Sequence, residues 1–214
     1  MENILETIYK AIVEIEGGGN TNVPALVQQA LDEGIEPGRI LEEGMVSAMG
    51  KVGSLFEEGE YYVPEMLMAA RSMKAGLAVL KPALVSSNVQ SAGKVVAGTV
   101  KGDLHDIGKN LVCMMLEGAA FEIIDLGSDV TPESFVEAVK SSGAQVVAMS
   151  ALLTTTMPKM KETIEALNAS GLRHRVKVIV GGAPLTSGYA QEIGADGYAQ
   201  DASRAVALVK SLVS

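Results

Sequence analysis

From Lys94 onward, short apolar runs alternate with longer segments of helical periodicity, and this alternation limits the possible folds more than any other feature. Continuous apolar runs such as Val146-Val147-Ala148-Met149 suit strands that are covered on both faces. Strands that alternate with helices form parallel sheets with right-handed crossovers. We predict strands at 94–100, 121–126, 145–150, 176–181 and 196–199, and helices at 107–118, 132–142, 157–169, 187–193 and 202–213.

Residues 1 to about 80 contain helical patterns only. Apolar residues recur at helical spacing in four segments of similar length, and Pro24, Pro37 and Pro64 stand where three of these segments begin. Proline suits the first helical turn, where its missing N–H would have no partner. We predict an all-α four-helix bundle whose last helix stops at Pro82. The polar stretch 86–93 predicts a linker, so the expected domains are 1–88 and 89–214.

Polar and small residues collect where the predicted strands end. We predict a flavodoxin-like (Rossmann-like) parallel five-stranded sheet of order 2-1-3-4-5, in which ligands bind beyond the carboxyl ends of the strands. The first strand is followed by His105, one of two histidines in the chain, with Asp103 just before it. Asp103 is near enough in sequence to fix the tautomer of a ligating imidazole. Gly181 and Gly182 follow the fourth strand and would let a flat ligand approach the backbone.

Charge and cysteine content argue against some partners and favour one location. The net charge of −9 argues against nucleic acid and against an anionic membrane surface. The single cysteine allows no intramolecular disulfide, which fits the cytoplasm. No apolar run reaches the length of a membrane span, and the N-terminus does not have the pattern of a secretory signal. We therefore expect a cytoplasmic protein without nucleic-acid or membrane partners.

Plainer interpretations of the loop residues remain open at this point. His105 fits a satisfied surface histidine about as well as a ligand, and Asp103 or Asp106 would also serve as a helix cap. A hydrolase triad of Asp103, His105 and Ser150 lacks the Gly-x-Ser-x-Gly elbow. A mononuclear metal site at Asp103, His105 and Asp106 lacks a second histidine cluster. The methionines of the helical half fit the core of a bundle, with a soft apolar cap over a flat ligand as the alternative.

Three motifs in order resemble those of the cobalamin-binding module, namely Asp-x-His-x-x-Gly, Ser-x-Leu and Gly-Gly. Here they read Asp103-Leu104-His105-Asp106-Ile107-Gly108, Ser150-Ala151-Leu152 and Gly181-Gly182. The sequence resembles the cobalamin-binding region of methionine synthase and the corrinoid proteins of methylamine- and methanol-type methyltransferase systems. The likeness covers nearly the whole chain, the helical half included.

The resemblance implies cobalamin bound base-off, with His105 as the lower metal ligand of cobalt. Asp103 would hydrogen-bond His105, and Thr156, where the family often has serine, would complete this relay. These three are the candidate catalytic residues. Tyr62 and Met66 would cap the upper face of the cofactor. Methionine synthase has a phenylalanine at about the position of Tyr62. The other cofactor-binding residues that the resemblance implies are Gly102, Leu104, Asp106, Ile107, Gly108, Ser150, Leu152, Thr154, Gly181, Gly182 and Ala202.

The resemblance also implies a methyl carrier that catalyses nothing alone. Its Co(I) would accept a methyl group from a substrate-specific methyltransferase. As methyl-Co(III), it would pass the group to a second methyltransferase, whose acceptor is a tetrahydrofolate-type pterin or a thiol such as coenzyme M. A reductive activator would reduce Co(II), which forms by oxidation, back to Co(I). The helical half would move about a hinge at 81–93. Methylamines, quaternary amines, methanol and methoxylated aromatics are all possible donors.

Two other functions use the same module. A cobalamin-dependent sensor or regulator would need an effector such as a basic DNA-binding element, for which the chain has neither room nor charge. The small subunit of a cobalamin-dependent mutase shares the histidine motif, but it is not expected to carry this helical half.

Overall fold

The computed structural model describes residues 3–14, 22–87 and 91–213. The chain divides into two compact units, the first made chiefly of residues 1–91 and the second chiefly of residues 92–214. The predicted boundary between residues 88 and 89, within the predicted linker, lies outside the described residues.

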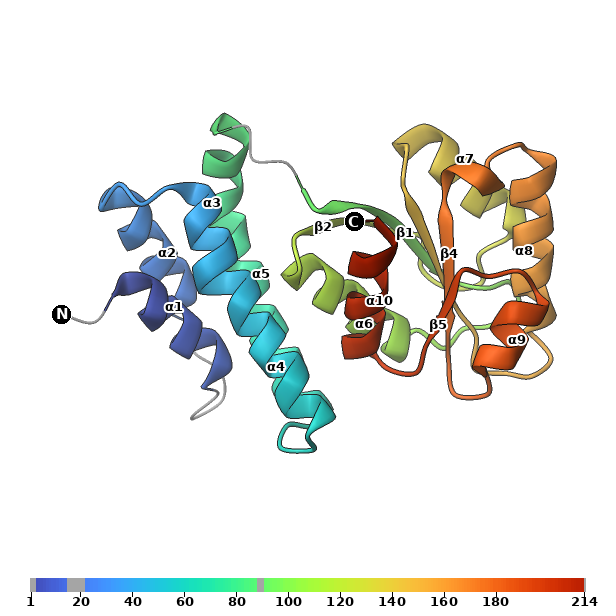
Figure 1. Cartoon of the computed structure of the whole chain (residues 1–214), viewed down its shortest axis with the longest axis horizontal. Helices are drawn as coiled ribbons and strands as arrows, with labels where there is room; N and C mark the ends of the chain where they lie inside the picture. Colours follow the sequence, from blue (N-terminus) through green and yellow to red (C-terminus); the bar gives the residue numbers. More distant parts are fainter. Residues whose placement is uncertain (1–2, 15–21, 88–90, 214) are drawn as a thin grey trace. The chain divides into compact units, whose positions relative to one another are not determined.

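The first unit is helical, as predicted. It contains α1 (Ile4–Val13), α2 (Val23–Asp32), a helix that runs through α3 (Pro37–Arg39), the π-helical segment η1 (Ile40–Val46) and α4 (Ser47–Glu57), and then α5 (Val63–Ser86) (Figure 1). Three prolines stand in first helical turns, as expected. The methionines Met45, Met49, Met66 and Met73 are all buried, which agrees with their assignment to the core.

The predicted helix end at Pro82 is wrong, because α5 continues through this residue to Ser86. Leu80 and Leu84, four residues apart on one helix face, are both buried. Their burial stabilises the turn that contains Pro82, and tertiary packing of this kind outweighs a local helix-breaking tendency.

The second unit is an α/β fold with five parallel strands in the order β2-β1-β3-β4-β5, which confirms the flavodoxin-like prediction. Its strands are β1 (Gly93–Thr99), β2 (Phe121–Asp125), β3 (Val146–Ser150), β4 (Lys177–Gly181) and β5 (Gly197–Ala199). Its helices are α6 (Ile107–Gly118), α7 (Pro132–Ser142), α8 (Pro158–Ala169), the short 3₁₀ segment η2 (Arg173–Arg175), α9 (Ser187–Glu192) and α10 (Ala202–Val213). Each of the predicted strands and helices lies within a few residues of its predicted range.

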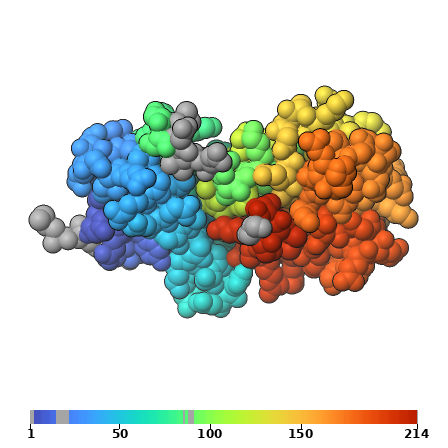
Figure 2. Space-filling view, turned by 45° about the horizontal axis from the view of Figure 1, so that its top comes forward, coloured from blue at the N-terminus to red at the C-terminus, as the bar shows by residue number. Residues whose placement is uncertain are grey.

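Helices cover both faces of this sheet. Side chains of α7, α8 and α9, among them Phe135, Met160 and Ala190, pack with the strands into one apolar core. Figure 1 shows α6 and α10 on the opposite face. The residues of β1, β3 and β4 are mostly buried. In the space-filling view, dark red residues of α10 lie at the surface of this unit (Figure 2).

The strand register brings the three motif loops to one edge of the sheet. Thr99 of β1 pairs with Ser150 of β3, which pairs with Gly181 of β4, and Gly181 pairs with Ala199 of β5. The segments that follow these residues therefore leave the sheet side by side. Within the described parts of the chain, no helix combines the length and the hydrophobicity needed to cross a bilayer.

Candidate functional site

The loop that carries His105 leaves β1 and is fastened to the edge of the sheet. The Asp103 N–H donates to the Val100 carbonyl at 3.1 Å, and Gly102 has a φ of +83°, in the left-handed region that glycine tolerates. The Thr99 hydroxyl donates to the His105 carbonyl at 3.0 Å. These contacts close a tight turn that directs Asp103 inward.

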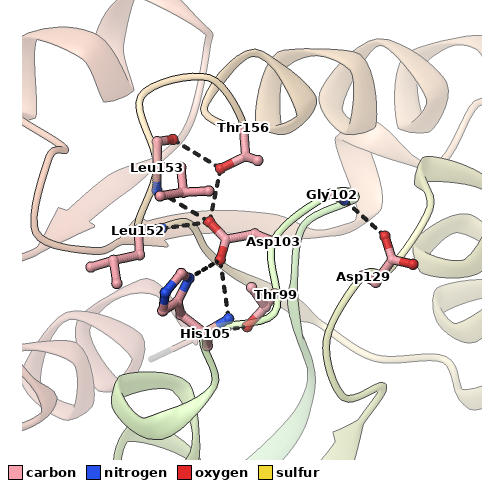
Figure 3. Close-up of polar contacts among 8 residues, drawn as sticks. All are labelled: Thr99, Gly102, Asp103, His105, Asp129, Leu152, Leu153 and Thr156. Carbon is pink, nitrogen blue, oxygen red and sulfur yellow. Dashed lines mark hydrogen bonds and ion pairs between the residues drawn. The ribbon is translucent and has the colours of Figure 1, made fainter.

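The Asp103 carboxylate accepts five hydrogen bonds, and the side chain is fully buried (Figure 3). Oδ1 lies 3.1 Å from the His105 N–H and 2.8 Å from His105 Nδ1. Oδ2 accepts from the N–H groups of Leu152 and Leu153, at 2.8 and 3.2 Å, and from the Thr156 hydroxyl at 2.8 Å. The carboxylate thus joins the loop after β1 to the loop after β3.

These donors keep Asp103 ionised. Burial by itself raises the pKa of the carboxyl, but the hydrogen bonds from Leu152, His105 and Thr156 outweigh burial and hold the pKa well below the ordinary value of 3.8. An ionised carboxylate can only accept, so neutral His105 must donate from Nδ1. Its Nε2 then carries the free lone pair. The imidazole is 53% exposed, so this lone pair is available to a ligand outside the fold.

Thr156 occupies the position that the resemblance gives to the third member of the relay, and its extra methyl group does not prevent the contact. Besides Asp103 Oδ2, its hydroxyl lies 2.8 Å from the Leu153 carbonyl. That carbonyl already accepts from the N–H groups of Thr156 and Met157, at 3.0 and 3.2 Å. The single hydroxyl proton is therefore available for the hydrogen bond to Asp103 Oδ2.

We expect Thr156→Val to destabilise the corrinoid-free protein by about 1 kcal/mol, because valine keeps the shape and removes one donor from a buried carboxylate. Thr156→Ser should keep the hydrogen bond and lose much less. Urea unfolding followed by circular dichroism measures both values. Equal stability of the valine variant and the wild type would mean that this hydrogen bond contributes nothing.

Exposed apolar side chains surround His105. Among the described residues of the α/β unit, the large hydrophobic side chains that are exposed are Leu104, Ile107, Leu152 and Leu153, with Leu104 at 73% and Ile107 at 78%. The first two flank His105 in sequence, and the other two follow β3. Exposed apolar side chains gathered in one place indicate a binding surface. This surface suits a flat, largely apolar ligand.

Small residues shape the neighbouring loops. A Cβ on Gly182 would lie 1.9 Å from the Ala151 carbonyl oxygen, and Gly182 has a φ of +136°, so only glycine allows the loops after β3 and β4 to approach this closely. A Cβ on Gly108 would meet nothing within 4 Å, so that position faces open space. Ser150 is half-buried at the end of β3, Thr154 is exposed in the next loop, and Ala202 is buried at the start of α10.

Two residues that the resemblance implies belong to the helical unit. Tyr62 precedes α5 and is 66% exposed, whereas Met66 in the first turns of α5 is fully buried. The Tyr62 N–H donates to Glu65 Oε2 at 2.9 Å, which fixes the turn before the helix. Within this unit Tyr62 is available to a ligand, and Met66 is part of the core.

Asp106 and Lys109 belong to a second group of polar contacts, around the start of α6. The Asp106 side chain accepts from Asn110 Nδ2 at 3.0 Å, and its carbonyl accepts from the Asn110 N–H at 2.8 Å. Lys109 is buried, and its Nζ lies 2.6 Å from both carboxylate oxygens of Asp125, at the end of β2. This pair fixes the start of α6 to the sheet. The motifs gave no sign of Lys109, because its burial is visible only in the fold.

The site's donor set fits a cobalt corrinoid. A cobalt corrinoid would bring most of the cobalt ligands itself, and Nε2 of His105 could supply a further nitrogen donor from the protein. Within the described parts of the chain, no group of three or more His, Cys, Asp or Glu side chains is placed to hold a metal ion. The arrangement therefore suits a prosthetic group that brings most of its own ligands.

Comparisons with known proteins lead to the same class. Two family models, each described as a B12 binding domain, match residues 93–207 and 4–81. The chain is 44% identical to dimethylamine corrinoid protein 2 of Methanosarcina acetivorans, over 99% of this chain and 97% of the relative. A cobalamin-binding protein from Desulfitobacterium hafniense has a similar crystal structure, with a TM-score of 0.82, 31% identity and full coverage of both chains.

A chain of the methanol:cobalamin methyltransferase complex of Methanosarcina barkeri is also similar, with a TM-score of 0.84 and 29% identity over 98% of this chain and 79% of that one. The fold and these matches define a cobalamin-binding protein. More particularly, the chain belongs to the corrinoid protein family.

Proposed function

We propose that this chain is the methyl carrier of a corrinoid-dependent methyltransferase system, with a helical domain at 1–88 and a cobalamin-binding domain at 89–214. The bound corrinoid supplies a cobalt centre that accepts and releases a methyl group. A substrate-specific methyltransferase would load the carrier, and a second one would unload it to a pterin or to a thiol such as coenzyme M. A reductive activator would restore carriers that become oxidised. The similarity to a dimethylamine corrinoid protein supports methylated amines as the donors.

The observation that carries this proposal is the 2.8 Å contact between His105 Nδ1 and buried Asp103, beside exposed apolar side chains. His105 Nε2 is the protein's donor to cobalt, and Asp103 holds the proton on Nδ1. Thr156 and the N–H groups of Leu152 and Leu153 orient Asp103 in turn. A carboxylate at this position would also stabilise positive charge on the His105 ring.

The other site residues bind and orient the cofactor. The apolar ones, Leu104, Ile107 and Leu152, cover its lower face and exclude water. Gly102 and Gly108 leave room for it beside the main chain, and Asp106 fixes the start of the helix that follows. The slot for the displaced nucleotide tail is lined by Ser150, Thr154, Gly181, Gly182 and Ala202. In the helical domain, Tyr62 and Met66 belong to the segment that caps the upper face.

Reconstitution tests the function. The protein is loaded with hydroxocobalamin, desalted and reduced, and it should retain about one corrinoid per chain. With a dimethylamine-specific methyltransferase and dimethylamine, its absorption spectrum should change to that of the methylated cofactor. Omitting either the enzyme or the amine should abolish the change. A protein that binds corrinoid and is methylated by none of the methyltransferases for dimethylamine, trimethylamine or methanol would contradict the carrier function.

A further inference from the structure

The main chain of the His105 loop is held from outside by Thr99 and Asp129, which belong to none of the three motifs (Figure 3). The Thr99 hydroxyl donates to the His105 carbonyl at 3.0 Å. Asp129, from the loop after β2, accepts from the Gly102 N–H at 2.8 Å, and its own N–H donates to the Asp103 carbonyl at 2.9 Å. The turn is thus fixed on both sides of Leu104.

Thr99 is itself held within the sheet by its burial and its main-chain hydrogen bonds. It is fully buried at the end of β1, its N–H donates to the Gly127 carbonyl at 2.9 Å, and its carbonyl accepts from the Val130 N–H at 2.9 Å. A buried hydroxyl is unfavourable unless it is hydrogen-bonded. Valine has nearly the same shape and suits a strand at least as well. A hydroxyl at this position therefore needs a reason other than packing, and its contact with His105 provides one.

Asp129 binds the other side of the turn, and its backbone conformation and an ion pair fix its position. Its φ of +58° places it in the left-handed region, which aspartate tolerates better than most residues. Lys101 Nζ lies 3.0 Å from Oδ2, which leaves Oδ1 for the Gly102 N–H. The side chain and the N–H of one residue thereby hold two successive residues of the loop.

We propose that Thr99 and Asp129 are positioning residues that set the direction of the His105 imidazole. The ring is held through the hydrogen bond between Nδ1 and Asp103, so its place depends on where the loop backbone holds these two residues. A ligating ring must be held within a fraction of an ångström of its bonding position. We call the contacts that Thr99 and Asp129 make with the loop the frame. The relevance of the frame to cobalt rests on the proposed function, whereas its effect on the ring is testable in the corrinoid-free protein.

Nitrogen-15 NMR of histidine-labelled, corrinoid-free protein measures the effect directly, because the chain has only two histidines. With both rings neutral, wild-type His105 should be in the Nδ1–H form. Thr99→Val should raise the population of the other tautomer, because the loop loses the hydrogen bond that holds the His105 carbonyl. Thr99→Ser should restore the wild-type population. Asp129→Ala should act in the same direction, and Asp129→Asn, which keeps an acceptor for Gly102, should act less.

Thr163 is the matched control. It is also fully buried, and its hydroxyl donates to the Lys159 carbonyl of its own helix at 2.8 Å. Thr163→Val should lower stability without changing the His105 tautomer. Equal tautomer populations in Thr99→Val and Thr163→Val would overturn the proposal.

The same variants loaded with methylcobalamin give a second readout. Thr99→Val should show a smaller fraction of cobalt with a lower nitrogen ligand than Thr163→Val, and equal fractions would argue against the frame. If the wild type itself showed no such ligand, the His105 part of the proposed function would fail, and the NMR comparison would still decide whether the frame positions the ring.

Discussion

His105→Ala loaded with methylcobalamin should show the absorption spectrum of a cobalt without a lower nitrogen ligand, whereas the wild type should show the spectrum of the ligated form. The ionised Asp103 keeps the proton on Nδ1 and leaves Nε2 as the donor. The second histidine of the chain, His174, lies in η2 and not in any of the three motifs. The change in spectrum should therefore be complete. Desalted samples read by absorption spectroscopy give the result.

His174→Ala is the matched control, because His174 lies in η2, away from the three motifs, and is the only other histidine of the chain. It should leave the spectrum of the loaded protein unchanged. Added imidazole should restore part of the ligated spectrum in His105→Ala, since the space of the missing ring is open to solvent. An unchanged spectrum in His105→Ala would exclude this residue as the ligand.

Most of the second unit could be predicted from sequence because its signals are local. Continuous apolar runs mark β3 and β4, and the helices between strands keep their periodicity and boundaries. The predicted end of α5 was wrong because its true position depends on contacts that are not local. A proline is a local signal, whereas the burial of Leu80 and Leu84 on either side of it depends on the tertiary fold.

The residues of the site also divide into those that the local sequence predicts and those that it does not. Asp103 and His105 are two residues apart, so their contact could be predicted from the sequence. Thr156 could be placed only through the family motif, since it meets Asp103 across 53 residues of chain. Thr99 and Asp129 act on backbone groups of the loop, and such contacts leave no characteristic spacing.

Asp103→Asn should destabilise the corrinoid-free protein by about 3 kcal/mol at neutral pH, a larger loss than the one expected for Thr156→Val. Asparagine has nearly the same shape, but its amide nitrogen is a donor. Wherever that nitrogen points, it faces either His105 or the donors of Leu152, Leu153 and Thr156, so buried donors lose their acceptor. Asp32→Asn, at an exposed aspartate near the end of α2, should change stability by less than about 0.5 kcal/mol.

The pH dependence gives Asp103→Asn a second, independent test. The pKa of Asp103 is lower in the folded protein than its ordinary value of 3.8. The stabilisation is therefore complete above that value and is lost as the pH falls below it towards the folded pKa. The stability difference between wild type and Asp103→Asn should narrow as the pH falls below about 4. Urea unfolding across this range, with Asp32→Asn in parallel, cancels the effect on stability of the carboxylates that the variants share.

A difference that stayed constant below the ordinary pKa would mean that the Asp103 carboxylate is not the group preferentially ionised by folding. The hydrogen bonds to Asp103 would then not explain how His105 is held.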